Sequence, residues 1–274
     1  MPYAFGAAAG GGAFPQITIN RSQTWVPSQD GVVCIHVVGA GGSGAIDTAF
    51  DDAAGGAGAY AKIPSLAVTT AGSFTLVVGV GGASKSISNN QTDGSAGGNS
   101  TIAGTGITGT LTCGGGGGGI YNVNVNPAVG GAVSGSTSQG WAGYSGGGGR
   151  VSGGAVGIFA TGNESMGFND TPYNRNGAAT DAAFGGLAMS GYGAICGGTT
   201  GGPQYTNNVD FRGEGDDFCG GGYGYATGSS SAQGGKGGVG AGGGAVFPSG
   251  GTAYSYKCIS GAGGNGIILI QYLS

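Results

Sequence analysis

Residues 32–38 have the sequence VVCIHVV, which is the strongest strand signal in the chain. They follow an Asp-Gly turn, and most positions carry the β-branched residues Val and Ile. Such a run predicts a strand that is buried on both faces of a sheet. It contains His36, the only histidine, on the same side as Cys34. We expect His36 to be half-buried with satisfied hydrogen bonds rather than part of a catalytic triad.

Further segments with strand character lie on both sides of this run. Residues 73–80 (SFTLVVGV) are the second strong segment, and residues 266–272 (GIILIQY) are apolar enough to lie in the middle of a sheet. We expect residues 32–38 and 266–272 both to be central strands and to pair with each other. Shorter strands are predicted at residues 16–20, 23–26, 59–63, 66–69, 100–103, 110–113 and 254–259.

Glycine dominates the composition: 72 of the 274 residues are Gly, only 7% are charged, and the formal net charge is −4. Helices are not expected, because a Gly in a helix costs about 1 kcal/mol relative to Ala and the longest glycine-free runs contain proline. The low charge argues against an expanded, disordered chain. No apolar run reaches the ~18 residues of a membrane helix. The Lys and Arg residues are scattered, which argues against nucleic acid as a partner.

Residues 114–251 form a glycine-rich excursion between two strand-rich ends. Within it Gly234, Gly237, Gly240 and Gly243 repeat every three residues, the number per turn of a polyproline-II helix. Bare faces would let neighbouring extended helices approach and exchange backbone hydrogen bonds, as in polyglycine II. Collagen is disfavoured because the Gly register is broken and proline is scarce. Silk-like disorder of the excursion stays open as an alternative.

The order of these pieces resembles the glycine-rich domain of bacteriophage tail-fibre and tail-tip proteins. The resemblance covers residues 24 to 272, although Ala71 stands where the family often has Pro. It implies a β-sandwich scaffold with glycine-rich loops, in a virion protein often involved in host attachment, and it brings no catalytic residues. The matching pieces are residues 24–27 (TWVP), residues 32–38 followed by GAGG at 39–42, residues 71–82 (AGSFTLVVGVGG), residues 97–101 (GGNST), Cys113 followed by six glycines, and residues 261–272 (GAGGNGIILIQY).

The predicted fold class is all-β: a jelly-roll-like β-sandwich with long glycine-rich loops, partly in polyglycine or polyproline-II helices, and essentially no α-helix. Residues 1–23 are expected to form a Gly/Ala-rich arm with a short strand, used for attachment or packing. Residues 24–274 are expected to form one glycine-rich β domain, with residues 114–251 as its excursion.

Residues 39–44 (GAGGSG) match the G-x-G-x-x-G pattern of dinucleotide-binding turns and follow a strong strand. Such a site also needs a following helix and an acid about 20 residues on. Here glycines follow, and no acid lies between Ala53 and Asp93. We interpret the motif as a glycine turn and expect no cofactor. An odd number of cysteines without a CxxC motif predicts free, buried thiols at Cys34, Cys113, Cys196, Cys219 and Cys258.

Acidic residues concentrate at Asp210, Glu214, Asp216 and Asp217, with Arg212 among them. Carboxylates this dense could bind Ca²⁺ or supply a glycosidase acid and nucleophile. The spacing is not that of an EF-hand loop, and Arg212 can pair with a carboxylate. A solvated or ion-paired loop is therefore favoured over a metal site or a catalytic pair.

Two stretches interrupt the glycine with aromatic and Asn residues, at residues 168–176 (FNDTPYNRN) and 203–211 (PQYTNNVDF). Tyr, Asn and Arg on a rigid scaffold suit recognition, because they offer large contact area and adaptable hydrogen bonds. The alternative is that these rings pack together as a small core of the loops. The candidates for receptor binding are Tyr173, Asn174, Arg175, Tyr205 and Asn207.

The expected function is that of a non-enzymatic bacteriophage virion protein, a tail-tip or fibre component. Its expected partners are other virion proteins and a host glycan or outer-membrane protein. A homo-oligomer is expected, with a trimer as one form, although no heptads encode it. The alternative is a secreted glycine-rich structural or ice-binding protein, against which the lack of a basic N-terminal region argues. A capsule-degrading enzyme is the third reading.

Overall fold

The computed structural model describes residues 16–46, 54–87, 92–121, 128–135, 142–144, 153–154, 156, 224–227, 232–249 and 258–274. These residues form strands, turns and extended segments, and none of them lies in a helix. The prediction of an all-β protein is therefore confirmed for the part of the chain that the structure describes.

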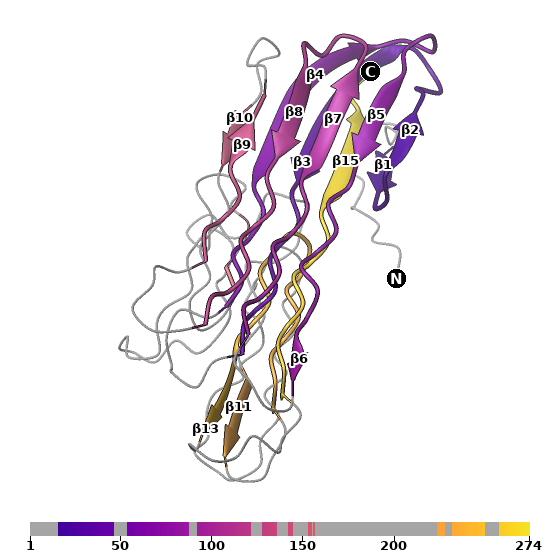
Figure 1. Ribbon diagram of the computed structural model, residues 1–274. Coiled ribbons are helices and arrows are strands. Elements are labelled where there is room, and N and C mark those ends of the chain that lie inside the picture. Colours follow the sequence, from indigo (N-terminus) through magenta and orange to yellow (C-terminus); the bar gives the residue numbers. More distant parts are fainter. Residues whose placement is uncertain are drawn as a thin grey trace.

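Two five-stranded antiparallel sheets form a sandwich at one end of an elongated molecule (Figure 1). The first sheet has the order β1-β15-β3-β4-β10, so that β3 (Gly31–Val38) and β15 (Ile267–Tyr272) are central and paired, as predicted. Its other strands are β1 (Gln16–Ile19), β4 (Tyr60–Val68) and β10 (Ala142–Tyr144). The second sheet joins β2 (Gln23–Trp25), β5 (Phe74–Val77), β7 (Ser100–Gly104), β8 (Thr110–Cys113) and β9 (Val133–Ser134) in that order. The jelly-roll connectivity is not confirmed.

β4 is one strand where two shorter ones were predicted, and it runs through Pro64. The pairing of β3 with β4 shifts between Val33 and Ile35, so that Pro64 and Ser65 together face Cys34. An extra residue of this kind is a β-bulge, and it stays outside the ladder of hydrogen bonds. A proline is tolerated in this interior strand because the bulge does not need its missing N–H.

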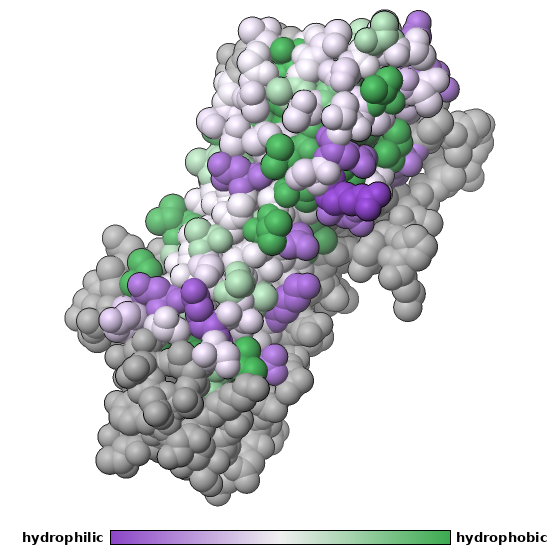
Figure 2. All heavy atoms as spheres, turned by 45° about the vertical axis from the view of Figure 1, so that its right-hand side comes forward, coloured by the Kyte–Doolittle hydropathy of each residue, from purple (hydrophilic) through white to green (hydrophobic). Residues whose placement is uncertain are grey.

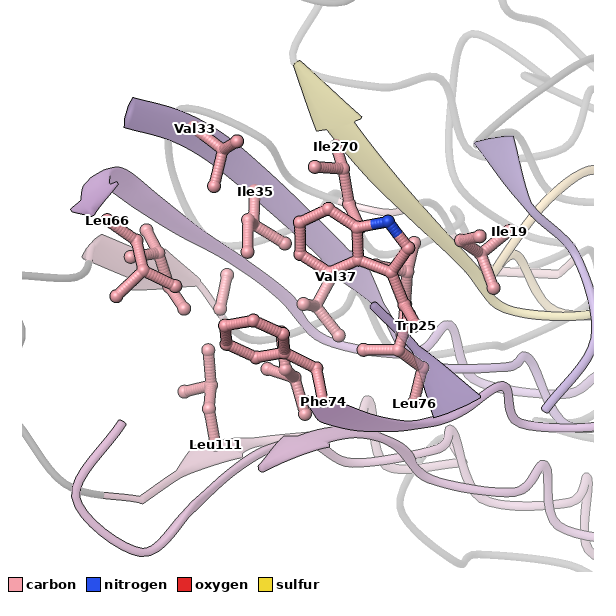
Figure 3. Close-up of a cluster of buried hydrophobic side chains, with 14 of the residues drawn as sticks. Ile19, Trp25, Val33, Ile35, Val37, Leu66, Phe74, Leu76, Leu111 and Ile270 are labelled. Atoms are coloured by element: carbon pink, nitrogen blue, oxygen red, sulfur yellow. The ribbon is translucent and has the colours of Figure 1, made fainter. Parts of the chain in front are cut away.

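The hydrophobic core lies between the two sheets, and Figure 3 shows side chains from both meeting there. β3 contributes Val33, Ile35 and Val37, which alternate along the strand and are fully buried. From the opposite sheet come Phe74 and Trp25, whose ring centroids lie 5.0 Å apart. Burying each of these large side chains contributes about 1.5–3 kcal/mol, so this core anchors the sandwich.

Small sheets form elsewhere: β11 (Gly224–Thr227) pairs in parallel with β13 (Val246–Ser249), and β14 (Cys258–Ile259) joins β12 (Ala232–Gln233) to β6 (Ser86–Ile87). β6, β11 and β13 lie at the end opposite the sandwich (Figure 1). Between the two ends the sandwich strands continue as extended segments. Residues 39–46, 78–85 and 114–121 follow β3, β5 and β8, and residues 54–59, 92–99 and 260–266 lead into β4, β7 and β15.

Candidate functional site

The G-x-G-x-x-G motif opens residues 39–46, which we call the central segment. Its backbone N–H groups donate to three neighbouring segments in strict rotation. Gly39 and Gly42 donate to residues 54–59, Ala40 and Ser43 to residues 92–99, and Gly41 and Gly44 to residues 260–266, over N–O distances of 2.8–3.1 Å. A partner that recurs every third residue is the signature of an extended helix with three residues per turn.

The carbonyl groups of the central segment reach three further neighbours. Ala40 and Ser43 accept from Gly116 and Gly119, Gly42 accepts from Gly243, and Gly41 accepts from Gly82. The central segment is thus surrounded by a ring of six segments, each hydrogen-bonded to the next and the last to the first. In order around the ring they are residues 54–59, 114–121, 92–99, 79–85, 260–266 and 240–246. We call these seven segments, with residues 128–132, 153–154 and 233–239 on their outside, the glycine lattice. Its hydrogen-bond pattern is that of polyglycine II.

The predicted period of three is confirmed at Gly234, Gly237 and Gly240, which all donate to residues 259–265. The repeat does not continue straight to Gly243, because the chain turns at Gly240, whose φ is 70°. Glycine is suited to that left-handed conformation. Residues 233–239 and 240–246 are therefore two adjacent segments rather than one.

Close packing explains why so many lattice positions are glycine. A Cβ atom added at Gly42 would overlap the carbonyl group of Gly117 and lie 2.9 Å from the nitrogen of Gly118. Side chains are accepted only where the lattice leaves room, as at Ala40 and Ser43, which are three residues apart and fully buried. Ser43 Oγ accepts a 2.8 Å hydrogen bond from the Ser95 N–H and so replaces a backbone carbonyl.

The interpretation of residues 39–44 as a glycine turn is wrong, since they form an extended lattice segment. A phosphate-binding loop needs free backbone N–H groups aimed at its ligand. Here every N–H from Gly39 to Gly44 donates to a neighbouring segment. The motif builds the scaffold instead of cradling a phosphate.

His36 is partly buried and hydrogen-bonded, as predicted. Its Nδ1 lies 2.8 Å from the Tyr60 hydroxyl, and its Nε2 lies 3.4 Å from Cys34 Sγ. Burial, with a smaller contribution from the Lys62 ammonium group, lowers the pKa of His36 to about 4. Burial also raises the pKa of the Cys34 thiol. A neutral thiol beside a neutral imidazole is the reverse of the ion pair that activates a nucleophilic cysteine.

The predicted receptor-binding residues, Tyr173, Asn174, Arg175, Tyr205 and Asn207, lie outside the described residues. So do the acidic residues Asp210, Glu214, Asp216 and Asp217. Within the described part of the chain, no group of three or more His, Cys, Asp or Glu side chains could hold a metal ion. Among the cysteines that the structure describes, Cys34 and Cys113 are free and buried, as predicted, and Cys258 is buried.

The long stretch that carries these candidates is attached to the lattice at both of its ends. Before it, Gly154 is hydrogen-bonded to Gly55 and Gly242. After it, Gly224 begins β11, at the end of the molecule farthest from the sandwich (Figure 1).

The described residues contain no long apolar helix of the kind that crosses a membrane.

A family model described as a glycine-rich domain matches residues 17–273 of the chain. A search of curated proteins found no match. The family match covers both the sandwich strands and the glycine lattice.

Proposed function

Because the chain belongs to the glycine-rich domain family, with residues 17–273 matched, we propose that it is a non-enzymatic bacteriophage virion protein. In this proposal it is a tail-tip or fibre component that binds a host surface receptor or a neighbouring virion subunit. The receptor is a cell-surface glycan or an outer-membrane protein. The protein acts in the assembled virion as a homo-oligomer, beside other tail or fibre proteins.

The glycine lattice is the observation that carries this proposal. Its interior is made of backbone hydrogen bonds, and the central segment is enclosed on all sides. Such a bundle is stiff and elongated, which suits a spacer that holds a recognition surface away from an anchoring sandwich (Figure 1). A glycine lattice offers few side chains with which to distinguish one ligand from another, so specificity is expected where glycine is interrupted.

The test replaces Tyr173, Arg175 and Tyr205 together by Ala and measures adsorption of the assembled particles to host cells. Truncating an aromatic or Arg anchor typically costs about 2 kcal/mol, or roughly 30-fold in affinity. Many copies per virion amplify even a smaller loss at each site. The matched control is Tyr121→Ala, which removes a 37% exposed ring from the lattice and should leave adsorption unchanged. Normal adsorption by correctly assembled triple-variant particles would show that these side chains are not the contacts.

Two further measurements separate the proposal from the other classes of protein. Mass spectrometry of purified virions should find the chain, and its absence there would favour a secreted structural or ice-binding protein. Incubation with host capsule or lipopolysaccharide should release no oligosaccharide. Released oligosaccharide would identify an enzyme instead.

A further inference from the structure

One segment of the ring around the central segment turns every third residue towards solvent. In residues 92–99 these are Asp93, Ala96 and Asn99, all exposed. Three residues of a polyproline-II helix rise about 9 Å, so the three side chains form one row along the lattice. On the face in Figure 2, small hydrophobic and hydrophilic patches are interspersed along the molecule.

In the neighbouring segment, residues 114–121, one set of N–H groups donates to no backbone carbonyl group of the described residues. Gly114 and Gly117 donate to residues 128–132, and Gly116 and Gly119 donate to the central segment. The remaining set belongs to Gly115, Gly118 and Tyr121. Gly115 N–H donates to Asn99 Oδ1 and Tyr121 N–H donates to Asp93 Oδ1, each over 2.9 Å.

The same arrangement recurs between two other segments of the ring, residues 79–85 and 260–266. Gly81 N–H donates to Asn265 Oδ1 over 2.9 Å, and Asn265 is exposed. In each case a short side chain with an oxygen two bonds beyond Cβ stands where the carbonyl group of a further lattice segment would lie.

We propose that Asp93, Asn99 and Asn265 are lattice-terminating residues that prevent a glycine-rich segment of a second copy from adding to the bundle. Outward N–H groups at the border of a lattice are the same liability as those of an edge strand, which can pair with another chain. Each terminating side chain satisfies one such N–H group. It also blocks close approach, because Cβ atoms at lattice contacts overlap the neighbouring backbone, as at Gly42.

One position in the row tests this geometry directly. Among the described residues, no hydrogen bond is found from the N–H of Gly118, which falls between the two capped positions. Its counterpart in the row is Ala96, which has no oxygen to offer. An Ala96→Asn substitution should therefore cap Gly118 and slow the hydrogen exchange of its amide at least tenfold. An unchanged exchange rate at Gly118 would overturn the assigned register.

The main experiment removes the caps by combining Asp93→Ala, Asn99→Ala and Asn265→Ala in the full chain. Sedimentation velocity over a concentration series should show self-association beyond the wild-type state, at least tenfold stronger, and the amides of Gly115 and Tyr121 should exchange faster. Lys236→Ala is the control, since it removes an exposed charge from an outer segment and no cap. A triple variant that associates no more than this control would refute the proposal.

A conservative variant keeps the test decisive if the triple variant does not fold. Asn99→Asp preserves Oδ1 and should keep both the wild-type association state and the slow exchange of the Gly115 amide. Asn99→Ala alone should lose that protection. Equal exchange rates at Gly115 in these two single variants would contradict a capping role for the side-chain oxygen.

Discussion

Gly42→Ala tests whether the lattice is held by close backbone packing. The new methyl group would overlap the carbonyl group of Gly117, so residues 114–121 would have to move outward by about 1 Å or more. That shift would stretch the bonds from Gly116 N–H to Ala40 O and from Gly119 N–H to Ser43 O, now 2.8 and 2.9 Å, beyond the usual limit of about 3.2 Å.

The expected cost is the sum of overpacking and lost hydrogen bonds. Overpacking costs about 1–3 kcal/mol, and each buried group left without its partner costs about 1–3 kcal/mol. We expect a loss of about 4 kcal/mol or more, a large part of the roughly 5–15 kcal/mol that stabilises a domain. At about 2–4 °C per kcal/mol, thermal unfolding followed by circular dichroism should shift down by about 10 °C.

Gly117→Ala is the matched control in the same lattice. Its Cβ would lie 3.2 Å from the carbonyl oxygen of Val129, a contact that a small adjustment relieves. Replacing Gly by Ala also stabilises by about 0.4–1 kcal/mol through the unfolded chain. The net change should stay within about 1 kcal/mol. If the two variants melt within about 3 °C of each other, close packing of the central segment is not what excludes side chains.

Three other predictions concern single side chains. The pKa of His36 is lowered from 6.5, its ordinary value, to about 4 in the folded protein. The free energy of unfolding therefore carries no penalty from His36 above about pH 6.5 and falls by up to about 3 kcal/mol as the pH falls towards 4. His36→Gln should flatten this part of the curve of unfolding free energy against pH, and an unchanged slope would argue that another group is responsible. The Tyr272 hydroxyl is buried without a hydrogen-bond partner among the described residues. Tyr272→Phe should therefore leave the free energy of unfolding in urea unchanged or raise it by about 1 kcal/mol, and a decrease of about 1 kcal/mol would contradict this. Thiol titration of the unfolded chain without reductant should find all five cysteines, of which Cys34 and Cys113 are free in the structure. Two or more missing thiols would instead favour a secreted protein.

The sandwich could be predicted from sequence where apolar side chains carry the information. β3 and β15 are nearly continuous β-branched and apolar runs, and such runs have few alternatives to a central position in a sheet. The break predicted at Pro64 was wrong for a local reason: a bulge, which depends on the register of β3 against β4, accommodates the proline. The register between two strands depends on both of them, so it cannot be predicted from the sequence of either strand alone.

Most of the lattice could not be predicted, because its signal is spread over short segments far apart in the chain. A period of three is visible in residues 234–243, where enough glycines follow one another. Residues 39–44 contain too few repeats to distinguish an extended helix from a turn, and their place at the centre depends on six partners. Asn99 and Asp93 likewise carry no distinctive motif, since their role appears only beside residues 114–121.

A protein built in this way separates stability from specificity more sharply than one with an ordinary side-chain core. At a lattice glycine such as Gly42, any side chain meets neighbouring backbone, so substitutions there change the free energy of unfolding and have no ligand to affect. Tyr173 and Tyr205 interrupt the glycine in the sequence, and under the proposed function their side chains contact the receptor. Variation should therefore be tolerated most at the interruptions and least in the central segment. This is the pattern that a receptor-binding protein needs when its receptor changes while its scaffold must still fold.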